Sequence, residues 1–186
     1  HRTAAGRSVI REIQAKTLLS HSKVPDPWFG IKYTMNLYRG CQHQCIYCDS
    51  RSECYQIENL ADILVKVNAI ELLDRELASK RTVGTVGTGS MNDPYMPVEA
   101  TIGLTRRALQ VLVKRMFPVH VITKSALVLR DADLLTEISR VYAAVSFTIT
   151  TVDDELGMRL EPGASLVSER LAAMAALSAR GILTGV

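Results

Sequence analysis

The sequence predicts an α/β protein built on a parallel sheet, specifically a partial (β/α) TIM-like barrel. Short β-branched runs alternate with amphipathic runs along the chain, and this repeat typically forms parallel sheets with right-handed crossovers. About five strands and four helices can be counted, whereas a complete eight-fold barrel takes about 250 residues. The last run, ILTGV, is not followed by a helix. We therefore expect a barrel truncated after about five strands, with an open doubly wound sheet as the alternative.

The first 30 residues differ in character from the rest. Residues 1–30 are basic and contain the turn cluster PDPWFG, with two prolines and a glycine. The initial stretch lacks the continuous apolar core of a secretory signal. We expect an irregular basic lead-in over residues 1–30, followed over residues 31–186 by the N-terminal part of the barrel.

The first elements of the barrel part are short. Residues 31–40 form a strand-like run that stops at Gly40. Residues 62–69 are rich in β-branched side chains that alternate with polar ones, which favours an extended segment. Residues 69–80 have apolar side chains at helical spacing, so we expect an amphipathic helix there.

The second half repeats the strand–helix pattern more regularly. Asp131 suits the N-cap of one helix, and Gly181 follows the end of another. The predicted strands cover residues 81–89, 119–125 and 143–151, and the predicted helices cover residues 98–116, 131–141 and 165–180.

Composition excludes several classes of protein. The chain has 186 residues, of which 47% are hydrophobic and 22% are charged, as is ordinary for a globular domain. Its net charge of +3 is too small to indicate nucleic-acid binding by itself. No run of about 18 apolar residues exists, so we expect no membrane span. Without an export signal we expect a cytoplasmic protein, in which clustered cysteines are more often metal ligands or redox groups than disulfides.

Three cysteines lie within eight residues, in the loop after the first predicted barrel strand: Cys41, Cys45 and Cys48. A structural zinc site takes four ligands, usually from two separated pairs. Buried free thiols do not suit a loop rich in Gln, His and Arg, and a disulfide would leave one thiol odd. An iron–sulfur cluster fits better, because one short loop can supply several thiolates. Three thiolates would leave one iron open for a ligand.

The spacing Cys41-x-x-x-Cys45-x-x-Cys48, with Tyr47 before the third cysteine, resembles the signature of radical S-adenosylmethionine (radical SAM) enzymes. The resemblance implies that the three cysteines hold a [4Fe–4S] cluster and that the open iron binds the methionine moiety of SAM. Reductive cleavage of SAM would then yield a 5′-deoxyadenosyl radical that abstracts hydrogen from a substrate. It also implies an external electron donor of the flavodoxin or ferredoxin type, and it includes Tyr47 among the cofactor-binding residues.

Within that superfamily the chain is similar to the spore photoproduct lyase-like branch. The similar stretches run from about residue 36 to residue 186 and are NLYRGCQHQCIYCDSR, NDPYMPVE, VITKSALVLRD, VSFTITT and LEPGASLVSERLAAMAAL. The branch implies a lyase-like reaction, with nucleic acid as the candidate substrate class. Spore photoproduct lyase proper uses a cysteine after the second strand as a hydrogen-atom donor. Because Ser90 stands at that place here, the resemblance supports the SAM chemistry rather than the repair of thymine dimers.

The resemblance also assigns SAM contacts to polar residues at strand ends. Ser90, Asn92 and Asp93 lie where the family binds the SAM amino group, and their oxygens can accept hydrogen bonds from an ammonium. Lys124, at the end of an apolar strand, is expected to contact the SAM carboxylate or ribose. Asp93 could instead cap the turn before Pro94, and Lys124 could simply be solvated.

The strand over residues 143–151 alternates apolar and hydroxyl side chains. Ser146, Thr148 and Thr150 share one face, and we expect this face to point into the barrel. Thr148 best matches a family hydroxyl that touches SAM, with Ser146 as a second candidate. Threonine is also a good strand former, which is the simpler interpretation.

Four further residues receive structural interpretations. Glu161 and Arg170 are expected to form an ion pair that orders a loop, with direct contact to SAM as the alternative. His43 is expected to face solvent or to bind the backbone. Cys54 lies outside the motif and is expected to be a buried thiol.

A second function remains open from the sequence. A non-catalytic domain could hold zinc through the three loop cysteines and Cys54, and could contact nucleic acid through its basic N-terminal segment. The hydroxyl-lined strand and Lys124 would have no role in such a domain.

Overall fold

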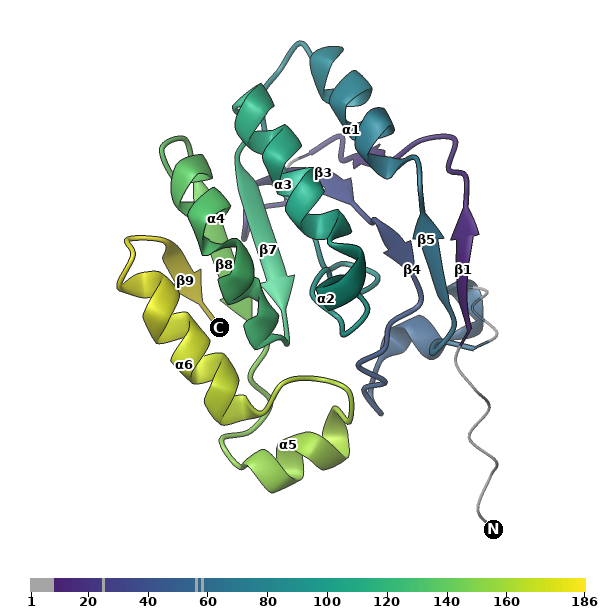
Figure 1. Ribbon diagram of the computed structural model, residues 1–186, viewed down its shortest axis with the longest axis vertical. Coiled ribbons are helices and arrows are strands. Elements are labelled where there is room, and N and C mark those ends of the chain that lie inside the picture. Colours follow the sequence, from purple (N-terminus) through teal and green to yellow (C-terminus); the bar gives the residue numbers. More distant parts are fainter. Residues whose placement is uncertain (1–8, 25, 56, 58) are drawn as a thin grey trace.

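A six-stranded sheet is the centre of the computed structural model, which describes residues 9–24, 26–55, 57 and 59–186 (Figure 1). The strand order is β2-β3-β6-β7-β8-β9, and every pair is parallel except β2 with β3. In the described residues the sheet is open, with β2 and β9 at its edges, so the α/β class and partial barrel are confirmed. The strands are β2 (Leu19–His21), β3 (Ile31–Met35), β6 (Thr85–Gly87), β7 (Val119–Thr123), β8 (Ala143–Phe147) and β9 (Leu183–Gly185).

Helices cover one face of this sheet (Figure 1). They bury apolar side chains against the strands because each has an apolar stripe at helical spacing. Leu73 and Leu77 of α1 (Ala69–Ala78) are fully buried in this layer, as are Leu109 and Leu112 of α3 (Leu104–Arg115). The covering helices are α1 (Ala69–Ala78), α3 (Leu104–Arg115), α4 (Ala132–Ile138) and α6 (Val167–Ser178).

Two predicted helices differ in detail from the structure. The helix predicted over residues 98–116 is divided into α2 (Glu99–Ile102) and α3 by Gly103, whose φ of 66° is left-handed. The helix predicted over residues 131–141 is α4, and the 3₁₀ segment η3 (Ala126–Asp131) leads into it. Asp131 occupies the N-cap position, but its side chain makes no capping bond, because the carboxylate pairs with Arg106 and Arg130 instead.

Other short elements lie near the strand ends. The helix α5 (Asp154–Leu160) was not predicted, although Asp153 caps it by accepting bonds from two backbone N–H groups at 2.8 and 3.1 Å. Two 3₁₀ segments, η1 (Asp49–Arg51) and η2 (Glu53–Tyr55), follow the cysteine loop.

The prediction of an irregular lead-in is wrong for part of residues 1–30. The strand β1 (Ile10–Ile13) pairs in parallel with β5 (Ile63–Lys66), and β4 (Tyr38–Arg39) pairs with β5 on its other side. The strand β2 joins the main sheet, and Glu76 accepts bonds from the backbone N–H groups of Leu18 and Leu19 at 2.9 Å each. Pairing with distant strands therefore orders this segment. Residues 1–8 and 25 lie outside the described residues, and the boundary at residue 30 stays a prediction.

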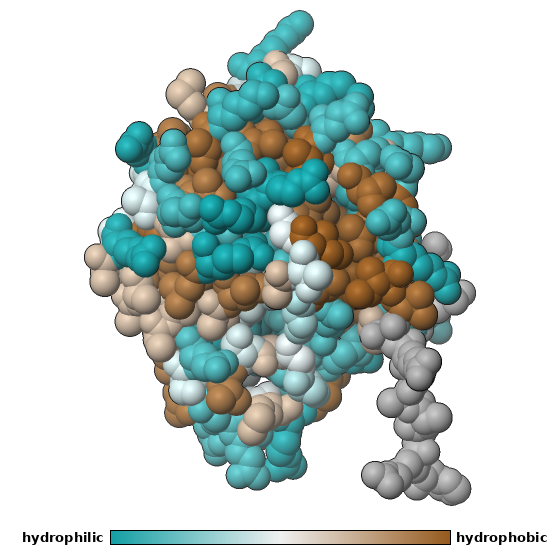
Figure 2. Space-filling view, in the orientation of Figure 1, coloured by the Kyte–Doolittle hydropathy of each residue, from teal (hydrophilic) through white to brown (hydrophobic). Residues whose placement is uncertain are grey.

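The helix-covered face is mostly hydrophilic. Figure 2 shows hydrophilic residues over the helices, with hydrophobic residues visible between them. Among the described residues, no helix combines the length and apolar character needed to cross a membrane.

Candidate cofactor site

The cysteine loop follows β4 and is held by backbone hydrogen bonds to two distant segments. Cys41 N–H donates to the Leu60 carbonyl at 2.8 Å. Ile46 N–H donates to the Leu160 carbonyl at 2.9 Å, next to the segment that joins α5 to α6. These bonds fix the loop at the edge where the parallel strands β6, β7 and β8 end.

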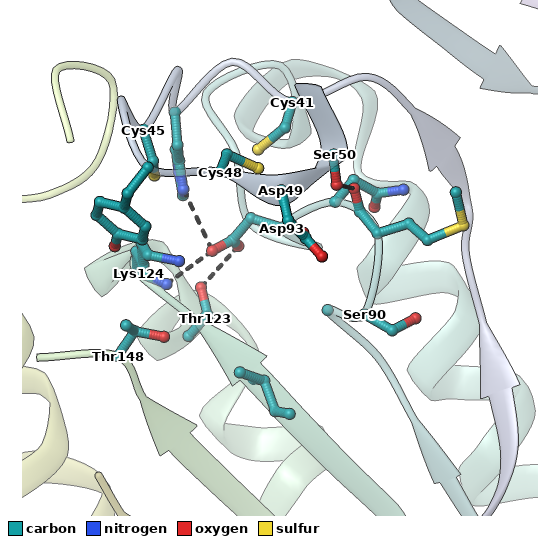
Figure 3. A pocket seen from close by; sticks show the side chains of 16 residues that line it. Cys41, Cys45, Cys48, Asp49, Ser50, Ser90, Asp93, Thr123, Lys124 and Thr148 are labelled. Atoms are coloured by element: carbon teal, nitrogen blue, oxygen red, sulfur yellow. Dashed lines mark hydrogen bonds and ion pairs between the residues drawn. The ribbon is translucent and has the colours of Figure 1, made fainter. Parts of the chain in front are cut away.

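The three loop cysteines line one cavity of about 280 Å³ (Figure 3). Its other walls come from the segments that follow β6, β7 and β8, because the carboxyl ends of parallel strands lie at one edge of a sheet. Six of the predicted cofactor contacts also line it: Tyr47, Ser90, Asn92, Asp93, Lys124 and Thr148.

Ser146 is the predicted contact that the structure places elsewhere. Its hydroxyl lies 2.8 Å from Nε2 of His120, within the sheet, and it is not among the residues that line the cavity. Ser146 lies on β8, and Thr148 directly follows the strand, two residues further along the chain. Of these two hydroxyl residues, Thr148 lies beyond the carboxyl end of β8 and lines the cavity.

Asp93 is the most connected side chain of the cavity. Its Oδ1 accepts hydrogen bonds from Tyr95 N–H at 2.8 Å and from the Thr123 hydroxyl at 2.7 Å. Its Oδ2 accepts one from Lys124 N–H at 2.7 Å and lies 3.3 Å from Nδ1 of His43. Burial alone would raise the pKa of this carboxyl, but the charge of His43 and these hydrogen bonds lower it instead. Asp93 therefore caps the turn and also links the cysteine loop to the end of β7.

Two sequence interpretations were wrong. His43 was expected at the surface or on the backbone, but it is 1% exposed because it packs against the buried Asp93 carboxylate. Cys54 was expected to be buried, but it is exposed, and its Sγ lies 2.9 Å from the Ser52 hydroxyl. Cys54 does not line the cavity of the three loop cysteines.

The protonation of the loop thiols depends on what binds them. Burial, followed by the charge of Asp93, raises the pKa of Cys41 to about 11. Burial also raises the pKa of Cys45, although the positive charge of Lys124 acts in the opposite direction. A bound metal stabilises thiolates and reverses this effect, so metal binding would release protons.

The arrangement of the thiols distinguishes an iron–sulfur cluster from a zinc site. In the part of the chain that the structure describes, no three His, Cys, Asp or Glu side chains group closely enough to hold a single metal ion. A polynuclear cluster separates its thiolate ligands more widely than one ion does. Three thiols around one cavity therefore fit an iron–sulfur cluster, whereas a four-thiolate zinc site would need the exposed Cys54.

Glu161 and Arg170 form the expected ion pair behind the cavity. Both side chains are buried, and Arg170 Nη1 lies 2.5 Å from Glu161 Oε2. The same Nη1 donates to the Thr148 carbonyl at 3.0 Å. The Tyr47 hydroxyl donates to Glu161 Oε1, and Lys124 Nζ lies 5.9 Å from the centre of the Tyr47 ring. The ion pair thus orders a loop, as predicted. It also holds Tyr47 and Thr148, which both line the cavity.

Several residues that line the cavity were not indicated by the sequence, and Thr123 has the clearest role among them. Thr123 lines the cavity, and its hydroxyl binds Asp93. Its place at the end of a predicted strand, directly before Lys124, was a usable signal. The bond from Tyr47 to Glu161 joins residues too far apart in the chain to be paired from one sequence.

An open, mainly parallel sheet with a three-cysteine loop and a polar cavity at its strand ends is the architecture of a partial (β/α) barrel with a candidate cofactor site. Comparison with protein families identifies the class: the chain belongs to the Radical SAM superfamily, whose model matches residues 35–186.

Relatives in curated collections are longer proteins. An uncharacterized protein of Methanocaldococcus jannaschii is 34% identical over 176 residues, which is 93% of this chain and 64% of that protein. An uncharacterized protein of Mycobacterium tuberculosis is 31% identical over 182 residues, covering 93% of this chain and 53% of that protein. A radical SAM Nα-GlyT isomerase of Pseudomonas phage M6 is 24% identical and covers 95% of this chain. The chain thus spans about half to two thirds of the first two relatives.

Solved structures show the same fold. Spore photoproduct lyase complexed with dinucleoside spore photoproduct superposes with a TM-score of 0.70 at 18% identity, covering 95% of this chain and 49% of the lyase. A variant of that lyase with bound AdoMet (S-adenosylmethionine) and dinucleoside spore photoproduct gives a TM-score of 0.70 at 16% identity.

Proposed function

We propose that this chain forms the cluster-binding and SAM-binding part of a radical SAM enzyme. Cys41, Cys45 and Cys48 would hold a [4Fe–4S] cluster as thiolates and leave one iron open for SAM. The single observation that supports this best is the shared cavity. It brings the three thiols together with polar side chains from the ends of three parallel strands.

When bound, the reduced cluster would supply the electron that cleaves SAM into methionine and a 5′-deoxyadenosyl radical, which abstracts hydrogen from the substrate. The residues of the chain would bind and orient SAM for this cleavage. The Lys124 ammonium suits the SAM carboxylate, and the side-chain oxygen of Asn92 suits its amino group. Both oxygens of Asp93 already have partners within the protein, so we propose that Asp93 positions Lys124 and the cysteine loop rather than binding SAM itself. Tyr47, whose exposed fraction is 49%, offers an aromatic face beside the third cysteine. A flavodoxin-type or ferredoxin-type donor in the cytoplasm would reduce the cluster.

Ser90, Ser146 and Thr148 differ in how well they suit cofactor contact. Thr148 lines the cavity at the end of β8 and would contact SAM through its hydroxyl. Ser90 lies at the exposed rim, 3.4 Å from the Asn36 side-chain oxygen. Ser146 is bonded to His120, so we propose that it shapes the inner face of the sheet rather than binding SAM.

We further propose a nucleic acid as the substrate class. The likeness to spore photoproduct lyase, solved with a dinucleoside, supports this class. Spore photoproduct lyase proper uses a cysteine after the second strand as its hydrogen-atom donor, and Ser90 stands at that place in this chain. A serine O–H bond is too strong for that step. The reaction would therefore be lyase-like in its SAM chemistry and would differ in its outcome.

The proposal is tested by anaerobic reconstitution with iron and sulfide, followed by EPR of the dithionite-reduced protein with and without SAM. We expect a [4Fe–4S]⁺ signal that changes when SAM is added. The signal should be lost in Cys45→Ala and kept in Cys54→Ala, which removes a thiol outside the cavity. Stoichiometric zinc uptake, with no cluster and no response to SAM, would instead establish the non-catalytic metal-binding domain.

A further inference from the structure

Two fully buried carboxylates lie outside the cavity that the three loop cysteines line. Glu99 is the first residue of α2, and Asp131 is the last residue of η3. Arg130 joins them, because its Nη2 lies 2.7 Å from Glu99 Oε1 and 2.7 Å from Asp131 Oδ2. A buried carboxylate is costly unless it is paired and hydrogen-bonded. The groups that bind these two carboxylates are therefore held in fixed positions.

Two buried tyrosines donate hydrogen bonds to these carboxylates. The Tyr38 hydroxyl donates to Glu99 Oε2, and the Tyr95 hydroxyl donates to Asp131 Oδ2 at 3.1 Å. Burial, followed by the charge of the carboxylate that each tyrosine contacts, raises the pKa of both phenols. Both hydroxyls therefore keep their protons and remain donors. We call these four residues and Arg130 the tyrosine–carboxylate network.

Tyr38 connects the network to the cysteine loop and to one candidate SAM contact. It lies on β4, three residues before Cys41, and its carbonyl accepts a hydrogen bond from the Asn92 side chain at 2.6 Å. A carbonyl only accepts hydrogen bonds, so the amide nitrogen of Asn92 faces Tyr38. The amide oxygen is then the atom that can accept a hydrogen bond from a ligand.

Tyr95 connects the network to the opposite candidate contact. Its N–H donates to Asp93 Oδ1 at 2.8 Å, and Asp93 Oδ2 accepts a hydrogen bond from Lys124 N–H at 2.7 Å. Asp131 follows Lys124 in the chain, at the end of η3. The network thus holds both segments that would receive the methionine moiety of SAM.

We propose that Tyr38 and Tyr95 are positioning residues of the SAM site. Because their hydroxyls are anchored on the buried carboxylates, they set the distance between the Asn92 side chain and the Lys124 ammonium. The amino and carboxylate groups of SAM are bonded to the same carbon atom, so two protein groups can bind both only at a fixed spacing. Holding that spacing in advance lowers the cost of binding. This inference rests on the proposed radical SAM function.

Tyr38→Phe and Tyr95→Phe remove one hydroxyl each and keep the buried ring. Glu99 Oε2 would still accept a hydrogen bond from a backbone N–H at 3.0 Å, and Asp131 Oδ2 would still contact Arg130 at 2.7 Å. Neither carboxylate is left unpaired, so we expect both variants to fold.

Tyr33→Phe is the matched control. Tyr33 is a buried tyrosine of β3, and its hydroxyl donates to the Thr82 carbonyl at 2.8 Å. It does not line the cavity of the loop cysteines. The control therefore makes the same chemical change in the core, away from the candidate SAM contacts.

The first test is the SAM titration of the EPR signal after reconstitution. The SAM concentration that gives half of the EPR change should rise about tenfold in Tyr38→Phe and in Tyr95→Phe, which corresponds to about 1.4 kcal/mol. The iron content per protein should stay normal in both. Tyr33→Phe should lower the urea midpoint but leave the half-saturation unchanged. An equal rise in Tyr33→Phe, or no rise in either network variant, would overturn the positioning role.

Amide hydrogen exchange of the metal-free protein, followed by NMR, separates this inference from the cofactor proposal. The N–H of Cys41, which donates to the Leu60 carbonyl at 2.8 Å, should exchange about tenfold faster in Tyr38→Phe, because a bond to a charged group that anchors this segment is lost. The N–H of Lys124 should do the same in Tyr95→Phe. Unchanged exchange would overturn the network's role in holding the cavity. A wild-type chain without cluster or SAM response would instead refute the proposed function.

Discussion

The Asp93 carboxylate shows how a single side chain can organise several segments at once. It accepts hydrogen bonds from the backbone of Tyr95 and Lys124 and from the Thr123 hydroxyl, and it contacts His43. A buried carboxylate with this many donors stays ionised despite its burial. Its charge is thereby committed to the protein's own structure. The Lys124 ammonium, in contrast, lies over the Tyr47 ring and is the cation that the cavity offers to a ligand.

Substitution of Lys124 tests this distinction. Lys124→Met should leave cluster formation intact, because the thiols remain and the Lys124 backbone still binds Asp93. The concentration of SAM that gives half of the EPR change should rise about tenfold to a hundredfold, which corresponds to a lost bond to a charged group. Lys16→Met, an exposed lysine in the lead-in, should change neither quantity. An unchanged half-saturation in Lys124→Met would remove this residue from the SAM site.

At the scale of elements, the segment between α5 and α6 behaves as a structural support for the site. The buried Glu161–Arg170 pair joins the end of α5 to the first turns of α6, and Arg170 also binds the carbonyl of Thr148 after β8. Glu161 accepts a hydrogen bond from the hydroxyl of Tyr47, which belongs to the cysteine loop. Removing either charge leaves the other buried and uncompensated, which is costly.

Glu161→Gln should therefore lower the free energy of unfolding by about 3–5 kcal/mol. Urea denaturation followed by circular dichroism gives this value. Glu137→Gln changes the same group on the exposed surface of α4 and should alter stability by no more than about 0.5 kcal/mol. Equal stability of the two variants would show that the ion pair contributes nothing to the fold.

The order of strands and helices was predictable because it depends on local patterns. Alternating β-branched runs and helical stripes gave the parallel sheet, and the cysteine spacing indicated the loop. The short strand β1 was missed because its order comes from pairing with β5, about 50 residues away in the chain. The division of the predicted helix at Gly103 was missed. The Glu99 side chain accepts a hydrogen bond from Thr105 N–H in the first turn of α3, and this contact has no periodic signal in the sequence.

The candidate site was predictable only in part. Residue types at strand ends correctly indicated which side chains gather around the cavity, such as Asp93 and Thr148. The burial of His43 depends on its contact with Asp93, and the exposure of Cys54 depends on the short 3₁₀ segment η2. Neither depends on a periodic pattern, so one sequence taken by itself does not reveal them.

At the scale of the whole molecule, the site joins the beginning and the end of the chain. Gly163 N–H donates to the His43 carbonyl at 2.9 Å, and the neighbouring backbone of Gln42 lies so close that a side chain at residue 163 has no room. A Cβ atom there would lie 2.1 Å from the Gln42 carbonyl oxygen. The cysteine loop and the segment before α6 can therefore pack this closely only because residue 163 has no side chain.

Gly163→Ala should separate these two segments and reduce cluster binding together with stability. We expect fewer iron and sulfide ions per protein after reconstitution and a free energy of unfolding lower by about 1–3 kcal/mol, as for other overpacked sites. Gly185→Ala is the matched control, because a Cβ atom there would be 3.9 Å from the Ser146 hydroxyl, an ordinary contact. Normal iron content in Gly163→Ala would show that the loop binds its cluster independently of the segment before α6. Iron loss confined to Gly163→Ala would instead mean that the cluster site depends on the close contact between the cysteine loop and the segment before α6.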